Sequence, residues 1–126
     1  PKLGNKAGII TNAGGLGVLT TDACEENNIK VPSLSKSAMN KLSQFLPGAW
    51  SHNNPIDIIG DALAEDYEKT IQIAEKENFD FLITLLTPQY MTEELETAKA
   101  LLKIKKPVFA CFLGGSKTSE AKKLMR

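Results

Sequence analysis

The stretch AGIITNAGGLG, residues 7–17, contains the strongest fold signal in the chain. Its first half, Ala7–Thr11, is short and apolar and ends in a glycine-rich turn, which predicts a buried strand. After the turn, Leu16, Leu19 and Ala23 recur at helical spacing, so we expect a helix with these residues on its buried face. A strand, a glycine turn and a helix in immediate succession indicate an α/β fold.

Strands and helices continue to alternate along the rest of the chain. Apolar runs predict a strand or extended segment at residues 29–34 and buried strands at 79–86 and 108–113. Periodic segments predict helices that begin near residues 16, 35, 63, 92 and 116, with Ser35, Thr92 and Ser116 as N-caps. This order is typical of a parallel sheet with helices on both faces.

Length and composition limit the possible classes of function. The 126 residues suffice for one domain, and 15 basic and 15 acidic residues give a net charge of +0, which argues against a nucleic-acid-binding surface. No apolar run is long enough to span a bilayer and no leader segment is recognisable, so we expect no membrane association and a cytoplasmic location. Cys24 and Cys111 lack metal-ligand spacing and are expected to be reduced thiols, and no metal site is predicted.

The chain begins at Pro1 and ends at Arg126 within a helical pattern, so we expect residues 1–126 to be one domain of a longer polypeptide. In parallel sheets, ligands bind outside the carboxyl ends of the strands. The loops at residues 12–15, 87–89 and 114–116 should share that edge.

The glycine turn is the first candidate site. The backbone N–H groups of Ala13–Gly17 begin a helix and lack upstream carbonyl partners, and the helix dipole adds attraction for an anion. Gly14 and Gly15 have no Cβ, so a phosphate group can approach the backbone closely, while Gly17 would allow tight packing of helix on strand. No lysine follows at the spacing of a nucleotide-binding P-loop. The alternative is a tight strand-to-helix turn without a ligand.

Polar residues in two other loops are further candidates. Asn54 and Asp57 flank a proline and project polar groups at fixed positions, although an Asx turn that only shapes the loop explains them equally. Thr87 and Gln89 either offer a hydroxyl and an amide to a ligand or simply end a strand. His52 has no recognisable nucleophile or metal-ligand partner, so we expect a surface histidine.

Several motifs together resemble one family of enzymes. IITNAGGLGVL (9–19), DACE (22–25), NPID (54–57), LTPQ (86–89) and KPV (106–108) occur in the order and at the spacing of the ADP-forming acyl-CoA synthetases, which are related to succinyl-CoA synthetase. The chain resembles the ligase domain of the acetyl-CoA synthetase alpha chain, which is similar to the carboxyl-terminal domain of the succinyl-CoA synthetase beta subunit. The resemblance covers essentially the whole chain.

The resemblance implies a three-layer, flavodoxin-like sheet whose last strand lies beyond this chain. It implies an acetate–CoA ligase (ADP-forming) that carries phosphate on a histidine and uses CoA, ADP or ATP, phosphate and Mg²⁺, none of them bound tightly by this domain. The phosphohistidine would come from another segment, so no catalytic residue is expected here. The implied binding residues are Asn12, Ala13, Gly14, Gly15, Leu16 and Gly17, with Thr11, Asn54, Asp57, Thr87 and Gln89 in support.

The 126 residues lack several parts that the family resemblance implies. They include no Ser-His-Thr-Gly segment, CoA-binding domain or ATP-grasp nucleotide-binding domain, so these are expected as partners, and His52 is not given the phosphohistidine role. Three alternatives stay open: a stand-alone flavodoxin-like module that binds a nucleotide, flavin or acyl-CoA, a subunit-docking module, or part of an acetyltransferase-fused homologue. The acyl group, the nucleotide preference and the subunit arrangement are left open too.

Overall fold

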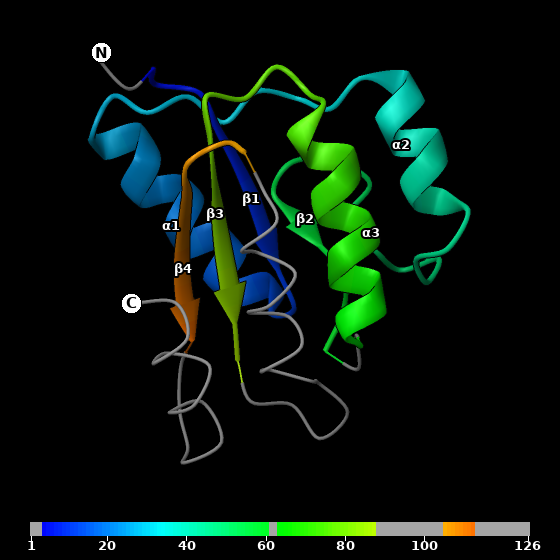
Figure 1. Ribbon diagram of the computed structural model, residues 1–126. Helices are drawn as coiled ribbons and strands as arrows, with labels where there is room; N and C mark the ends of the chain where they lie inside the picture. The colour runs from blue at the N-terminus through cyan, green and yellow to red at the C-terminus, as the bar shows by residue number, and fades with distance from the viewer. Residues whose placement is uncertain (1–3, 61–62, 88–104, 113–126) are drawn as a thin grey trace.

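The strands form one parallel sheet. The computed structural model describes residues 4–60, 63–87 and 105–112. Within them lie β1 (Ala7–Thr11), β2 (Ile56–Asp57), β3 (Phe81–Leu86) and β4 (Val108–Phe112). Their order is β2-β1-β3-β4 and all neighbours are parallel, as the arrows in Figure 1 show. The predicted parallel sheet is therefore confirmed.

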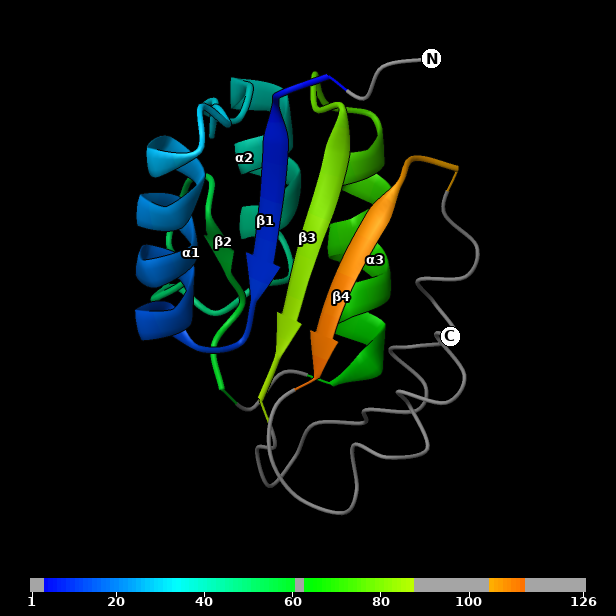
Figure 2. The same ribbon diagram turned by 90° about the vertical axis from the view of Figure 1, so that its left-hand side faces the viewer.

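The helices cover both faces of this sheet. Helix α1 (Gly14–Glu26) lies on one face, whereas α2 (Lys36–Ser43) and α3 (Ala64–Glu75) lie on the other, as Figure 2 shows. The Ser35 hydroxyl accepts a hydrogen bond from the Ala38 N–H at 3.1 Å, which confirms the predicted N-cap of α2. The predicted three-layer α/β arrangement is thus present in the described residues.

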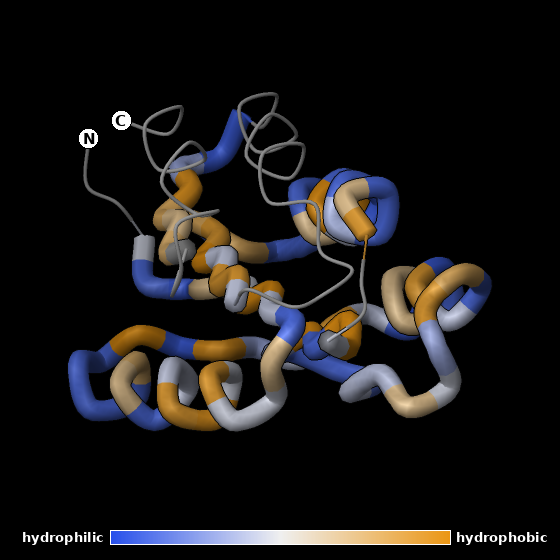
Figure 3. Tube along the Cα trace, turned by 90° about the horizontal axis from the view of Figure 1, so that it is seen from below, coloured by the Kyte–Doolittle hydropathy of each residue, from blue (hydrophilic) through white to orange (hydrophobic). Residues whose placement is uncertain are grey.

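Each face of the sheet has its own hydrophobic core, because successive strand residues point to opposite faces. Ile10 and Leu82 pack with α2 and α3, while Ile9 and Leu85 pack with Cys24 of α1. The strands accordingly form an apolar centre when the trace is coloured by hydropathy (Figure 3). Tyr67, Ile71 and Ala74 recur at helical spacing, which predicts that they share the buried face of α3, and all three are buried.

The strand that follows α1 and α2 beside β1 was not predicted, whereas residues 29–34, predicted as a strand or extended segment, form no regular strand. Residues 29–34 contribute only an isolated bridge between Lys6 and Lys30, and the neighbouring strand is instead β2 within the irregular segment 49–61. β2 has two residues and pairs only with Ile10 and Thr11. The Asn54 side chain hydrogen-bonds Ala7 and Ile9 on the same edge of β1, and apolar periodicity cannot predict a contact of this kind.

The predicted buried face of α1 is also wrong in part. Leu19 is 65% exposed and Ala23 is exposed, whereas Gly17 and Cys24 are the buried residues of this helix. A Cβ on Gly17 would lie 3.2 Å from Cγ2 of Thr11, so the helix approaches β1 through its glycine side. Leu16 still packs on the core cluster of this face, as predicted, whereas Val18 and Leu19 are exposed.

Some expectations lie outside the described residues. They are the helices expected to begin at Thr92 and Ser116, the loop at 114–116, and Gln89. No helix among the described segments is long and apolar enough to cross a membrane. Within these segments β2 and β4 are the edge strands of the sheet.

Candidate functional site

The turn between β1 and α1 is held by its own threonine. The buried Thr11 hydroxyl accepts from the Ala13 N–H at 3.0 Å and donates to the Ala13 carbonyl at 3.1 Å. The Gly17 N–H donates to the same carbonyl at 3.2 Å and begins the hydrogen bonding of α1. The N–H groups of Ala13 and Gly17 are therefore used within the protein and are not open to a ligand.

Three N–H groups of this turn remain available as hydrogen-bond donors. They are those of Gly14, Gly15 and Leu16, which have no acceptor among the described residues. The first turn of α1 contains no acidic side chain, so its partial positive charge is not offset from within the helix. A Cβ on Gly15 would meet no atom within 4 Å, which leaves the approach to these groups open. Open N–H groups at a helix N-terminus are a common arrangement for binding an anion.

A carboxylate stands beside this helix end. Asp57, at the end of β2, places Oδ2 3.0 Å from where a Cβ on Gly14 would lie. Its Oδ1 accepts from the Ile59 N–H at 2.9 Å, and Ile59 has a φ of 75°, a strained conformation for a β-branched residue. An ionised carboxylate accepts hydrogen bonds and cannot donate them, so it suits an N–H or O–H donor.

Asn12 joins the ends of β1 and β3. Its Oδ1 accepts from the Thr87 N–H at 2.9 Å and from the Thr87 hydroxyl at 3.1 Å, and its Nδ2 donates to the Thr87 carbonyl at 3.1 Å. The two loops predicted to share the carboxyl edge of the sheet therefore lie together. This geometry favours a structural contribution from Asn12 and Thr87, rather than direct contact with a ligand.

Asn54 acts as a substitute for a strand. Its Oδ1 accepts from the Ile9 N–H, and its Nδ2 donates to the carbonyls of Ala7 and Pro32, all at 2.9 Å. The side chain thereby continues the edge of β1 beyond the two residues of β2. It holds the loop that leads through Pro55 to Asp57, so Asn54 positions the site from outside it.

Sequence reasoning missed Ser51 and Val18. The Ser51 hydroxyl donates to the Pro55 carbonyl at 2.6 Å and accepts from the Asp57 N–H at 2.9 Å, which secures β2. Ser51 and Val18 line a cavity of about 310 Å³ at the start of α1, together with Thr11, Gly14, Gly17, Asn53, Asn54, Pro55 and Asp57. No local motif singles out Ser51, because its contacts form only in the folded loop.

His52 lies outside this cavity. It is exposed, its Nε2 lies 2.8 Å from the Gly48 carbonyl, and its ring lies 4.6 Å from that of Trp50. The expected surface histidine is confirmed. The described segments contain no cluster of histidine, cysteine and acidic residues able to hold a metal ion. Burial, followed by the nearby Asp57 carboxylate, raises the pKa of Tyr67 well above its ordinary value.

The family of the chain follows from its sequence and this geometry together. The Ligase-CoA domain family matches residues 7–125, from the first residue of β1 onward. The chain belongs to this family. This Ligase-CoA domain is 37% identical over 126 residues to the acetate–CoA ligase (ADP-forming) I of Archaeoglobus fulgidus, covering 99% of the chain and 18% of the relative.

Further relatives agree with this assignment. The alpha subunit of acetate–CoA ligase (ADP-forming) II of Pyrococcus furiosus is 34% identical, with 97% of the domain and 29% of that subunit covered. The structure of the dinucleotide-forming acetyl-coenzyme A synthetase 1 of Ca. Korarchaeum cryptofilum in complex with phosphate and ADP superimposes with a TM-score of 0.88 at 29% identity, covering 97% of the domain and 28% of that chain. The resemblance to ADP-forming acyl-CoA synthetases is confirmed, and the domain spans less than a third of these relatives.

Proposed function

We propose that residues 1–126 are the ligase domain of a longer ADP-forming acetate–CoA ligase, which converts acetyl-CoA, ADP and phosphate into acetate, ATP and CoA. In this proposal, the turn at the start of α1 stabilises a phosphohistidine supplied by another segment. The three open N–H groups of Gly14, Gly15 and Leu16 carry the proposal, because they form a positive helix end at the carboxyl edge of the sheet with no acidic residue in its own first turn.

The chemistry of the turn suits a phosphoryl group on an imidazole. Hydrogen bonds from N–H donors to a charged acceptor contribute about 1.5–3 kcal/mol each. In this proposal Asp57, whose carboxylate lies beside Gly14, would accept from the imidazole N–H and so orient the ring. A bare nucleotide is a poorer fit to the sequence, because no lysine follows the turn at the spacing of a P-loop.

The proposal assigns the remaining chemistry to partners. A CoA-binding domain, the phosphohistidine segment and an ATP-grasp domain, fused or separate, would supply CoA, phosphoryl carrier and Mg²⁺–nucleotide sites in a cytoplasmic enzyme. The relatives support this division, since they are longer chains or subunits named as ADP-forming ligases. The isolated domain should therefore form no ATP from acetyl-CoA, ADP and phosphate.

Gly15→Val in the intact ligase tests the role of the turn. A Cβ at this position meets no protein atom within 4 Å, so the fold should tolerate valine while the phosphoryl group loses its approach. We expect the amount of phosphoenzyme formed from ATP to fall on the order of tenfold or more, equivalent to the loss of one charged hydrogen bond.

Gly48→Val is the matched control, because a Cβ there also meets no atom within 4 Å, and Gly48 does not line the cavity. Both variants should unfold at the temperature of the parent enzyme. Wild-type levels of phosphoenzyme in Gly15→Val would refute the proposed function. Tight binding of a nucleotide or flavin by the isolated domain would favour a stand-alone binding module instead.

A further inference from the structure

A second cavity lies between α2 and α3, on the face of the sheet opposite α1. Its volume is about 200 Å³, and both helices contribute to its walls. Pockets for drug-sized molecules generally measure about 300–1,000 Å³, so this one suits a ligand smaller than a nucleotide. Two residues of the lining, Ala38 and Ile73, are apolar and pack on the core. The other lining residues are polar or charged, and they are Ser37, Lys41, Gln72, Lys76 and Glu77.

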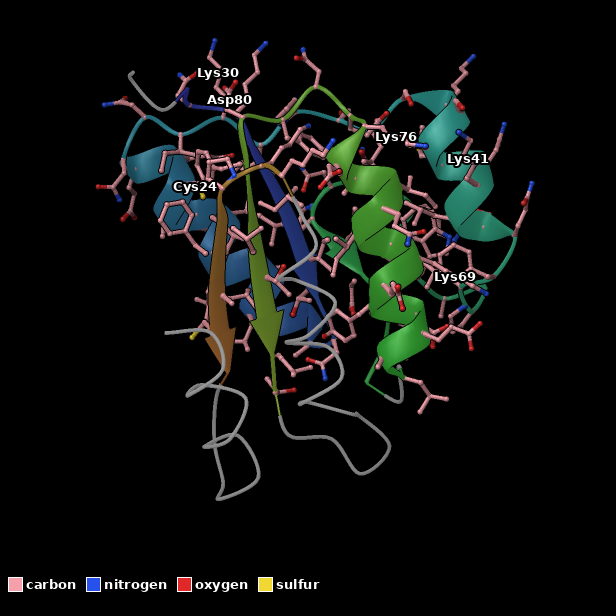
Figure 4. All side chains as sticks on the ribbon, viewed as in Figure 1. Cys24, Lys30, Lys41, Lys69, Lys76 and Asp80 are labelled. Carbon is pink, nitrogen blue, oxygen red and sulfur yellow. The ribbon has the colours of Figure 1, made fainter. Side chains whose placement is uncertain are left out.

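Two lysines line this cavity from different helices. Lys41 belongs to α2 and Lys76 is the C-cap of α3 (Figure 4). Among the described residues, neither ammonium group has a carboxylate at ion-pair distance or an acceptor for a hydrogen bond. Like charges repel each other. Two such cations in one cavity therefore cost the empty fold electrostatic energy, and an anion bound between them would offset that cost.

Neighbouring lysines of the same surface do have partners. Lys69 of α3 forms an ion pair with Glu65 at 3.0 Å. The Lys106 ammonium group donates to the Glu77 carbonyl at 2.6 Å. The two lysines of the cavity differ from these neighbours, because no group among the described residues offsets their charge.

The carboxylate in the lining is directed elsewhere. Oε1 of Glu77 accepts from the Ser35 N–H at 2.8 Å, and Oε2 accepts from the Ser35 hydroxyl at 3.0 Å. Both oxygens of Glu77 therefore hold the start of α2. The described lining thus has two positive charges against one negative charge, and the Ser37 hydroxyl and the Gln72 amide add neutral donors.

We propose that the cavity between α2 and α3 binds the phosphate group of a small molecule, either as the free anion or as part of an organic phosphate. Lys41 and Lys76 bind its oxygens from the two helices, while Ser37 and Gln72 donate further hydrogen bonds. A lysine ammonium group is a compact charge and a common phosphate ligand. The apolar residues Ala38 and Ile73 suit a small carbon skeleton attached to the phosphate.

This site is separate from the glycine turn and does not depend on the proposed function. The turn follows the carboxyl end of β1, whereas Glu77 of the cavity lies shortly before the amino end of β3. Since the strands are parallel, the two places lie toward opposite edges of the sheet as well as on opposite faces. The cavity is therefore a second anion site, remote from the first.

Other ligand classes fit the cavity less well. A carboxylate has two oxygens for the four donor side chains of the lining, whereas a phosphate group presents three terminal oxygens. A nucleic acid would need a basic surface much larger than this cavity, and the net charge of the chain is +0.

An NMR titration of the 126-residue chain with inorganic phosphate tests the proposal, with sodium chloride keeping the ionic strength constant. The amide signals of Ser37, Ala38 and Gln72 should shift and saturate. Lys41→Gln combined with Lys76→Gln should weaken binding on the order of tenfold or more, as expected for the loss of a charged hydrogen bond. Both lysines are exposed, so the double variant should unfold at the parent temperature.

Lys30→Gln combined with Lys36→Gln is the matched control, because both lysines are exposed and neither lines the cavity. It removes the same charge and should bind phosphate as the parent chain does. Equal weakening in the two double variants would reduce the effect to general electrostatic attraction and overturn the proposal. So would the lack of a saturable shift, or shifts confined to residues 13–17.

Two further titrations identify the ligand and separate the sites. Ethyl phosphate that binds more tightly than inorganic phosphate indicates an organic phosphate, and the reverse order indicates the free anion. Tighter binding of succinate than of either would show that phosphate is the wrong class. Gly15→Val should leave the shifts at Ser37 and Gln72 unchanged, and their loss in this variant would refute a separate site without bearing on the phosphoenzyme assay.

Discussion

Replacing Asn54 by alanine should destabilise the fold more than any exposed asparagine would. The Asn54 side chain bonds the Ile9 N–H, the Ala7 carbonyl and the Pro32 carbonyl at 2.9 Å each. Ile9 and Ala7 are both 0% exposed, so neither backbone group can turn to solvent when the side chain is removed. Pro32 is only half-buried, and its carbonyl can be hydrated more cheaply.

The magnitude follows from the two orphaned groups. Each buried polar group left without a partner costs about 1–3 kcal/mol, so Asn54→Ala should lower the free energy of unfolding by roughly 2–6 kcal/mol. Since small domains have total stabilities of about 5–15 kcal/mol, the loss should be plain. Urea unfolding of the 126-residue chain measures it, with the fluorescence of Trp50, the single tryptophan, as the signal.

Asn40→Ala is the control, since Asn40 is exposed on α2. A loss below about 1 kcal/mol for Asn54→Ala, or one equal to that of Asn40→Ala, would refute the view that the side chain completes the sheet edge. Asn54→Asp gives a second check. It keeps the acceptor for Ile9 but faces two carbonyls with a carboxylate, so its stability should recover as the pH falls and the carboxyl gains a proton.

Three further outcomes are expected. Burial, and then a nearby carboxylate, raises the pKa of Tyr67. The contribution of Tyr67 to the free energy of unfolding should therefore be complete below about pH 10 and be lost as the pH rises further. Tyr67→Phe should weaken this alkaline loss, as measured by thermal unfolding. Exposed Cys111 should react with a chromogenic disulfide reagent at pH 8 well before buried Cys24, which is labelled in Figure 4. The reason is that burial and a neighbouring acidic residue raise the pKa of Cys24, and equal reaction rates would contradict this. Asn12→Ala should cost about 1–3 kcal/mol in urea unfolding, since it removes the acceptor of the Thr87 N–H.

Much of the fold could be predicted because its signals are local. β1 was predicted with the bounds that the structure shows, and the Ser35 cap and the buried face of α3 were predicted as well. Each depends on residues within one or two turns of each other. The presence of an open helix end at the glycine turn was predicted for the same reason.

The missed features are those that depend on distant residues. β2 has only two residues, and Asn54 replaces the rest of that strand through bonds to residues 22 to 47 positions away. The inner face of α1 was mistaken because apolar periodicity assigns large side chains to the core, while here a glycine makes the close contact. A helix that packs through a glycine cannot be recognised from hydrophobic spacing alone.

The three glycines at the start of α1 differ in whether packing within the fold requires them. Gly17 has a steric reason within the fold, since a Cβ there would lie 3.2 Å from Thr11 Cγ2. At Gly14 a Cβ would lie 3.0 Å from Oδ2 of Asp57, which is the end of a side chain. At Gly15 a Cβ would touch nothing within 4 Å. Packing therefore gives a reason for Gly17, whereas Gly15 is the position at which a ligand requirement can be separated from a folding requirement.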